Sequence, residues 1–184
     1  MASVITATTT SGLTHSADNS GILQLASGTG NLVTVPSVTG TAMVSGNMPA
    51  FSAYQSGSAQ SLSANTQTKI QINTEEFDTA SCYDSTTNYR FTPNVAGYYQ
   101  FIGNVQWGTN NAGASVTFYK NGSASKQGTL SSGTTPSGGS ATAVIYLNGS
   151  TDYVEMYALS ASLSNTTSPA QTTVYFQGFL VRAA

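Results

Sequence analysis

Apolar residues in this chain recur in short runs with a period of two, and this pattern constrains the fold more than any other feature. The runs are bounded by glycine, asparagine, proline or serine and occupy residues 68–72, 89–91, 98–105, 114–119, 141–147, 153–159 and 173–181. Alternation with a period of two indicates β-strands, and no window sustains the three-to-four period of an amphipathic helix. Many short strands separated by turns predict an all-β fold, an antiparallel β-sandwich.

The residues between these runs predict how the strands connect. Asn121-Gly122 and Asn148-Gly149 each lie between two apolar runs, and Asn-Gly readily adopts the positive φ angles of a tight hairpin turn. We therefore expect a hairpin turn at each dipeptide. Residues 128–140 read GTLSSGTTPSGGS, a composition that is typical of a mobile surface loop, either a connector or a binding loop.

The composition excludes several classes of partner. Only 7% of the 184 residues are charged, the formal net charge is −2, and the five Lys and Arg residues are scattered, so nucleic-acid binding is not expected. No apolar segment reaches the roughly 20 residues that span a bilayer, so we expect no membrane insertion. The single cysteine, Cys82, cannot form an intramolecular disulfide. Stability must therefore come from packing or from assembly.

The sequence offers little to catalysis, and we predict that the protein is not an enzyme. The only histidine, His15, lies in a polar segment, and no Walker, G-x-S-x-G or H-E-x-x-H motif is present. No cofactor is expected. One acidic cluster, formed by Glu75, Glu76, Asp78 and Asp84, could supply oxygen ligands to calcium. A solvated turn between two strands is the alternative interpretation.

The first 47 residues differ from the rest of the chain. Two short apolar pieces, residues 21–25 and 31–35, are embedded in Thr, Ser and Gly. Two strands are marginal in isolation, so this segment would be ordered by packing on sister chains or on another protein, or else it is an unstructured leader. We predict an anchoring or trimer-intertwining arm over residues 1–47, and a second domain over residues 48–184.

Residues 49–184 carry a series of landmarks that resembles one family. FTPNVAGYYQF (residues 91–101) fits the pattern F-x-P-x-x-x-G-x-Y-x-F, and FQGFLV (residues 176–181) fits a closing F-x-G-F-L strand. MPAFSAYQS, YKNG and LNGSTDYVEM add weaker matches in the same order. The series resembles the globular head of complement component 1q, a branch of the tumour-necrosis-factor-like superfamily. Ser150 and Thr151 depart from the pattern by lengthening one turn.

The resemblance implies a jelly-roll β-sandwich that assembles as a homotrimer. In the strand that contains Tyr99 and Phe101, Gln100 and Ile102 fall on the opposite face. By the family alignment Gln100, Ile102 and Tyr175 would point toward a threefold axis. In the closing strand, Phe176 and Phe179 fall on opposite faces if the strand is regular. Either both faces are then covered or Gly178 marks a β-bulge.

The arm has a resemblance of its own. Residues 16–28 fit the pattern SAD-x-SG-x-L-x-L-x-(T/S)-G, which resembles segments of bacteriophage tail-fibre and head-fibre proteins. An initiating Met, no signal peptide and no collagen-like Gly-X-Y repeat agree with a virion protein assembled in the host cytoplasm. This resemblance implies a capsid-decorating or fibre-like virion protein whose arm contacts capsid or tail proteins. The alternative is a tail-associated receptor-binding module that holds a host surface glycan.

Overall fold

The protein is described by a computed structural model that covers residues 23–26, 32–35, 43, 46, 48–108, 113–129, 137–161 and 163–184. The chain divides into two compact units, Met1–Ala42 and Met43–Ala184. No α-helix occurs in the described ranges, and nothing helical there could therefore cross a membrane. The roles predicted for residues 1–47 and 48–184 stay predictions. His15 lies outside the described residues.

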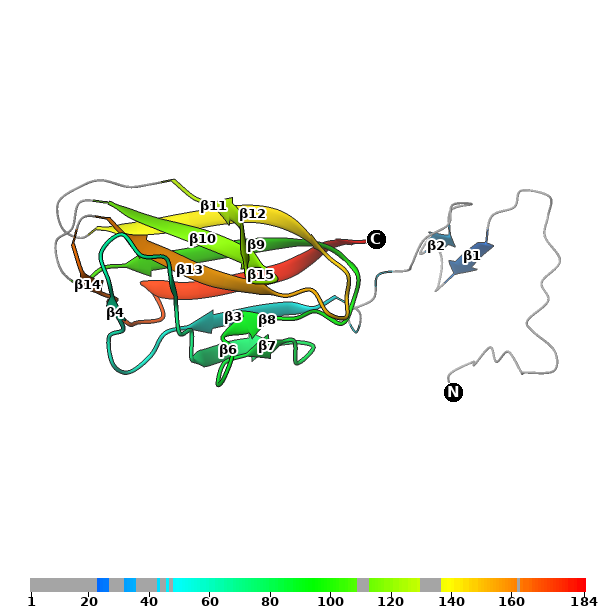
Figure 1. Ribbon diagram of the computed structural model, residues 1–184. Helices are drawn as coiled ribbons and strands as arrows, with labels where there is room; N and C mark the ends of the chain where they lie inside the picture. Colours follow the sequence, from blue (N-terminus) through cyan, green and yellow to red (C-terminus); the bar gives the residue numbers. More distant parts are fainter. Residues whose placement is uncertain are drawn as a thin grey trace. The chain divides into compact units, whose positions relative to one another are not determined.

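The second unit is a sandwich of two antiparallel sheets, as the strand pattern predicted (Figure 1). The five-stranded sheet has the order β12 (Gly138–Leu147), β9 (Gly97–Gln106), β15 (Val174–Ala183), β3 (Ala50–Tyr54) and β6 (Thr74–Asp78). The six-stranded sheet has the order β11 (Ser123–Gln127), β10 (Ala114–Lys120), β13 (Val154–Ser160), β8 (Arg90–Phe91) and β7 (Tyr83–Asp84), with β5 (Thr68–Lys69) also on β13.

In the described part of the chain, two strand pairs lie outside these sheets. At one end of the sandwich β4 (Ser61–Leu62) pairs with β14 (Asn165–Thr166). In the first unit β1 (Leu23–Ala26) pairs with β2 (Leu32–Val35). The predicted apolar pieces of the arm thus coincide with two paired strands.

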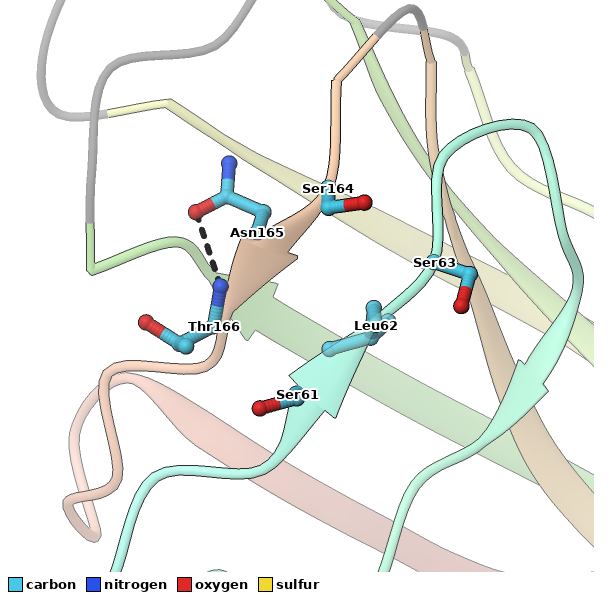
Figure 2. A pocket seen from close by; sticks show the side chains of 6 residues that line it. All are labelled: Ser61, Leu62, Ser63, Ser164, Asn165 and Thr166. Atoms are coloured by element: carbon cyan, nitrogen blue, oxygen red, sulfur yellow. Dashed lines mark hydrogen bonds between the residues drawn. The ribbon is translucent and has the colours of Figure 1, made fainter.

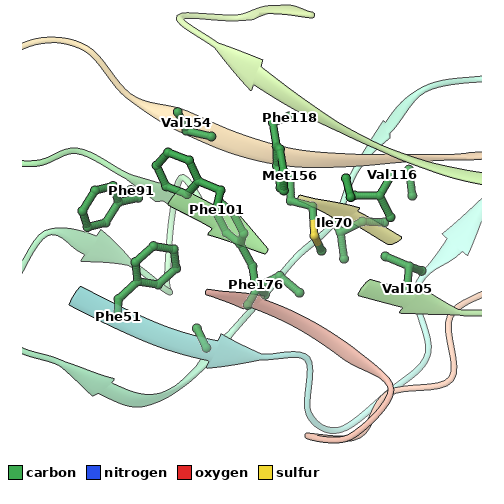
Figure 3. Close-up of a cluster of buried hydrophobic side chains, with 14 of the residues drawn as sticks. Phe51, Ile70, Phe91, Phe101, Val105, Val116, Phe118, Val154, Met156 and Phe176 are labelled. Atoms are coloured by element: carbon green, nitrogen blue, oxygen red, sulfur yellow. The ribbon is translucent and has the colours of Figure 1, made fainter. Parts of the chain in front are cut away.

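Aromatic rings fill the space between the two sheets (Figure 3). Phe101 of β9 is fully buried, with its ring centroid 5.7 Å from that of Phe176, 5.8 Å from Phe91 and 6.0 Å from Phe118. Burial of an aromatic side chain contributes about 2–3 kcal/mol of transfer free energy, and close ring pairs add to it. These inward residues occupy alternate positions of their strands, which is why the period-two pattern predicted them.

The two Asn-Gly dipeptides have different outcomes. Asn121 and Gly122 have φ angles of 52° and 76° and form the predicted tight turn between β10 and β11. The hairpin predicted at Asn148-Gly149 is wrong, because β12 and β13 belong to different sheets. The Asn148 Oδ1 atom instead accepts hydrogen bonds from the backbone N–H groups of residues 150, 151 and 152, at 2.9–3.0 Å. The side chain thereby organises a wider connection that crosses between the sheets.

The surface loop predicted over residues 128–140 is too long at its C-terminal end. Gly138, Gly139 and Ser140 are strand residues, because β12 pairs with β9 from Gly138 onward. Residues 130–136 lie outside the described residues. The glycines therefore begin a strand that their composition alone assigned to a loop.

Gly178 lies in a regular stretch of β15, so it marks no bulge; the register shift comes later, between Leu180 and Arg182. In register Gly178 is placed between Phe101 of β9 and Phe51 of β3. A Cβ atom at this position would come within 2.7 Å of Phe101 Cδ1 and 2.8 Å of Phe51 Cε1. The absence of a side chain at Gly178 therefore provides the space that the rings of Phe51 and Phe101 occupy.

We expect Gly178→Ala to lower the free energy of unfolding by about 1–3 kcal/mol, because the added methyl group overpacks the aromatic layer. Chemical denaturation measures the change. Gly46→Ala is the matched control, since a Cβ at Gly46 meets no atom within 4 Å. Equal stability of the two variants would contradict the packing described for Gly178.

Candidate functional site: the outer face of the five-stranded sheet

One face of the five-stranded sheet packs on the core, and the other faces away from the second sheet. We define the outer face as the residues that alternate with core residues on its four long-paired strands: Tyr98, Gln100, Ile102 and Asn104 of β9, Thr142, Val144 and Tyr146 of β12, Tyr175, Gln177 and Phe179 of β15, and Ser52 and Tyr54 of β3. None of these residues carries a charge, but two charged residues border them: Arg182 of β15 lies opposite Tyr98 in register, and the Glu76 carboxylate of β6 accepts a hydrogen bond from Ser52.

The structure brings the three predicted interface residues together on this face. Gln100 and Ile102 are successive outer-face residues of β9, and Tyr175 lies on the adjacent β15 opposite Asn104. All three side chains are half-buried in the single chain. Their placement agrees with the predicted alternation, but their position at a threefold axis stays a prediction.

The outer face is apolar at one end. Tyr98, Val144, Tyr146 and Phe179 retain 45%, 51%, 43% and 43% of their accessible surface. Tyr98 is directly opposite Tyr146 in register, and their ring centroids are 5.4 Å apart. These residues gather at the end of the sheet where β9 begins and β15 finishes. Large exposed apolar groups that are contiguous mark an interaction surface.

The period-two pattern placed most of these exposed residues within predicted strands, but it did not identify them as a contact surface. Tyr98 belongs to the predicted run 98–105, while Val144 and Tyr146 alternate with Ile145 and Leu147 in the run 141–147. What the sequence lacked was the register between β9 and β12, which sets Val144 opposite Gln100. Only that pairing shows that the apolar residues form one patch.

A polar network crosses the same face near its β6 edge. Ser52, buried beneath its neighbours, accepts a hydrogen bond from Gln177 Nε2 at 2.9 Å. The Ser52 hydroxyl donates in turn to the Glu76 carboxylate, which also accepts a hydrogen bond from Gln171. The network fixes the side chains on this part of the face, because every member is held by a neighbouring strand or loop.

The six-stranded sheet presents a different outward surface, on which polar groups are paired within the chain. Lys69 Nζ lies 2.6 Å from Glu155 Oε1, and the Arg90 guanidinium lies over the ring of Tyr153 at 4.3 Å. Tyr119 and Tyr157 stack with ring centroids 3.9 Å apart. The contrast identifies the outer face of the five-stranded sheet as the candidate contact surface.

The acidic cluster does not assemble into a cation site in the described part of the chain, where no group of three or more metal-ligating side chains is found. Glu75 accepts a hydrogen bond from Ser85 at 2.5 Å, while Asp78 accepts from the backbone N–H of Tyr83 at 2.7 Å. Asp84 accepts from the backbone N–H groups of residues 86, 87 and 88. The carboxylates are thus separated and engaged by neighbouring donors.

A pocket of about 370 Å³ lies between β4 and β14, at the end of the sandwich opposite the apolar patch (Figure 2). It is lined by one aliphatic and five hydroxyl or amide side chains, Leu62 with Ser61, Ser63, Ser164, Asn165 and Thr166. No lining residue is charged or basic, so the pocket holds no nucleophile paired with a general base. Its chemistry suits a neutral polar ligand.

Comparison with known proteins shows the fold. No protein-family model and no curated protein matches the chain. The globular domain of zebrafish complement 1qA protein is similar with a TM-score of 0.54 and 17% identity, covering 74% of this chain and 99% of its own. Eiger TNF from S. frugiperda is similar with a TM-score of 0.59 and 9% identity, covering 75% of this chain and 95% of its own.

A third similar structure comes from a virus. The PRD1 vertex protein P5 gives a TM-score of 0.58 at 15% identity, covering 73% of this chain and 97% of its own. At these identities the likeness shows the fold alone. The described part of residues 43–184 thus has an all-β jelly-roll fold, similar to those of the complement 1q and tumour-necrosis-factor structures.

The Asp84 carboxylate predicts how stability depends on pH. Hydrogen bonds from the backbone of Thr87, the side chain of Asn88 and the backbone of Thr86 hold the pKa of Asp84 well below its ordinary value. Because the pKa is lower in the folded chain, this contribution is present above the unfolded pKa of about 4 and is lost as the pH falls below it.

We expect Asp84→Asn to lower the free energy of unfolding at pH 7 by up to about 1 kcal/mol, a small effect because the carboxylate is partly exposed. The variant should also lose less stability than the parent chain between pH 5 and pH 2, measured by urea denaturation. Glu75→Gln removes one charge nearby and serves as control. A parallel pH dependence of parent and Asp84→Asn would refute the role of Asp84.

Proposed function

We propose that this protein is a non-enzymatic structural component of a bacteriophage virion, a trimeric capsid-decorating or fibre-like protein. Residues 48–184 form the projecting jelly-roll head, and residues 1–47 form the arm that anchors it to capsid or tail proteins. The observation that carries the proposal is the patch of exposed apolar residues at one end of the outer face of the five-stranded sheet. The fold likeness to the PRD1 vertex protein P5 supports the virion setting.

The outer face suits self-association for a physical reason. Burial of Tyr98, Val144, Tyr146 and Phe179 removes apolar surface from water, and none of these four residues carries a charge that burial would desolvate. A cyclic trimer uses heterologous contacts, in which one part of a surface meets a different part of the next copy. A broad face with an apolar end and a polar end offers both kinds of contact. Gln100 and Ile102 lie midway along β9, and Tyr175 lies opposite Asn104, nearer the end of that strand; in the proposed trimer these three residues would approach the threefold axis.

We expect Val144→Asp to convert a trimer, three times the 18.9 kDa of one chain, into a folded single chain. Val144 is half exposed in the single chain, so folding tolerates the charge, whereas an interface would bury it without a partner. Light scattering at micromolar concentration measures the mass, and circular dichroism checks the fold. Leu163→Asp, at a residue that is 58% exposed and outside the sheets, should leave the trimer intact. A single-chain mass for the parent protein would refute the proposal.

A second candidate function is a receptor-binding module for a host surface glycan. The pocket between β4 and β14 favours it, because hydroxyl and amide side chains beside Leu62 can hydrogen-bond a neutral sugar. The pocket lies at the end of the sandwich remote from the start of β3, where the arm joins the head (Figure 1). A head anchored by its arm would present this end outward.

Deletion of residues 1–47 separates anchoring from folding. We expect the truncated chain to remain a soluble trimer but to be absent from purified particles, measured by mass spectrometry of virions from cells that express either form. Incorporation of the truncated chain would contradict the anchoring role. If the purified full-length protein binds host cells and blocks infection, the receptor-binding function replaces decoration.

A further inference from the structure

The paired strands of the arm have two unlike faces. In register, Leu23 is opposite Val35 and Leu25 is opposite Val33. Residues two apart in a strand share a face, so these four aliphatic residues occupy one face of the β1–β2 pair. Gln24 opposite Thr34 and Ala26 opposite Leu32 occupy the other.

A pair of strands this short needs a partner. Each strand has four residues, and a two-stranded hairpin is at best marginally stable in water, whereas three or more strands with an apolar face can be stable. The aliphatic face defines where a partner would add stability. The question is which molecule supplies it.

The charge pattern favours an identical copy. Residues 19–48 contain no Asp, Glu, Lys, Arg or His. Such a segment has no charge with which to select a charged partner, and it does not repel a copy of itself. Four matched aliphatic residues on one face are also self-complementary in chemistry.

Chain connectivity then brings copies together. The arm continues through Met48 and Pro49 into β3, whose first residue, Ala50, pairs with Phe179 at the apolar end of the outer face. If three heads associate through that face, three arms start close to one another. Tethering raises the local concentration of the arms and favours their association without any new contact in the head.

We infer that the β1–β2 pair is a second assembly element. Through the face that carries Leu23, Leu25, Val33 and Val35, it binds the β1–β2 pair of each of the two sister chains. The inference rests on the proposed trimer and adds to it a self-association site in the arm. The heads bring the three strand pairs together, and the aliphatic faces then form a small shared core.

Cysteine cross-linking of the full-length protein tests the inference. In a chain that carries Cys82→Ala, the variants Leu25→Cys and Val33→Cys place one thiol each on the aliphatic face, and Gln24→Cys places it on the other face of the same pair. We expect mild oxidation to give covalent dimers, seen on a non-reducing gel, on the order of tenfold faster for Leu25→Cys and Val33→Cys than for Gln24→Cys.

Light scattering on the same samples separates this inference from the proposed trimer. If the protein is a trimer and the three cysteine variants cross-link at equal rates, the arm inference is overturned and the proposed function stands. A trimer in which Leu25→Cys cross-links only to another virion protein in assembled particles assigns the face to that protein and also overturns it. A monomer overturns both.

Discussion

The aromatic layer between the two sheets is the interaction on which the rest of the structure depends. Phe51, Phe101 and Phe176 come from three adjacent strands of one sheet, and their rings require Gly178 to have no side chain. Once these residues face inward, the alternate residues of β9 and β15 must face outward. A shift of one residue in register would exchange the two sets, so the packing of the core also determines the composition of the outer face.

The two sheets use their outward surfaces in opposite ways. On the six-stranded sheet, Lys69 with Glu155 and Arg90 with Tyr153 pair polar groups within one chain. The five-stranded sheet instead leaves Val144 and Phe179 half exposed, and its charged residues Arg182 and Glu76 lie beside the apolar patch and the Ser52 network. A chain with only 7% charged residues gains little from ionic contacts between subunits. Burial of the apolar patch on the five-stranded sheet is the form of association that this composition favours.

The sequence predicted the parts of the fold that follow from local pattern. Strands with alternating apolar residues, such as β9 and β12, and the Asn121-Gly122 turn were predictable because the signal lies within a few residues. The strand β11 was missed because Ser123–Gln127 is exposed throughout and has no alternating apolar residues, and the acidic residues of β6 favoured a turn. Asn148-Gly149 has the same local signal as Asn121-Gly122, and only long-range pairing distinguishes them. Gln100 and Ile102 could be placed on a shared face because they are two residues apart in one strand. The patch around Val144 could not be predicted, because it depends on the register between β9 and β12.

The acidic residues of β6 have a consequence for how large an assembly can grow. This strand is the last in its sheet and pairs only with β3 in the described part of the chain, so its other edge could accept a further strand. Three residues of this edge strand, Glu75, Glu76 and Asp78, are acidic. A second copy added edge to edge would bring like charges together, which disfavours open-ended sheet growth.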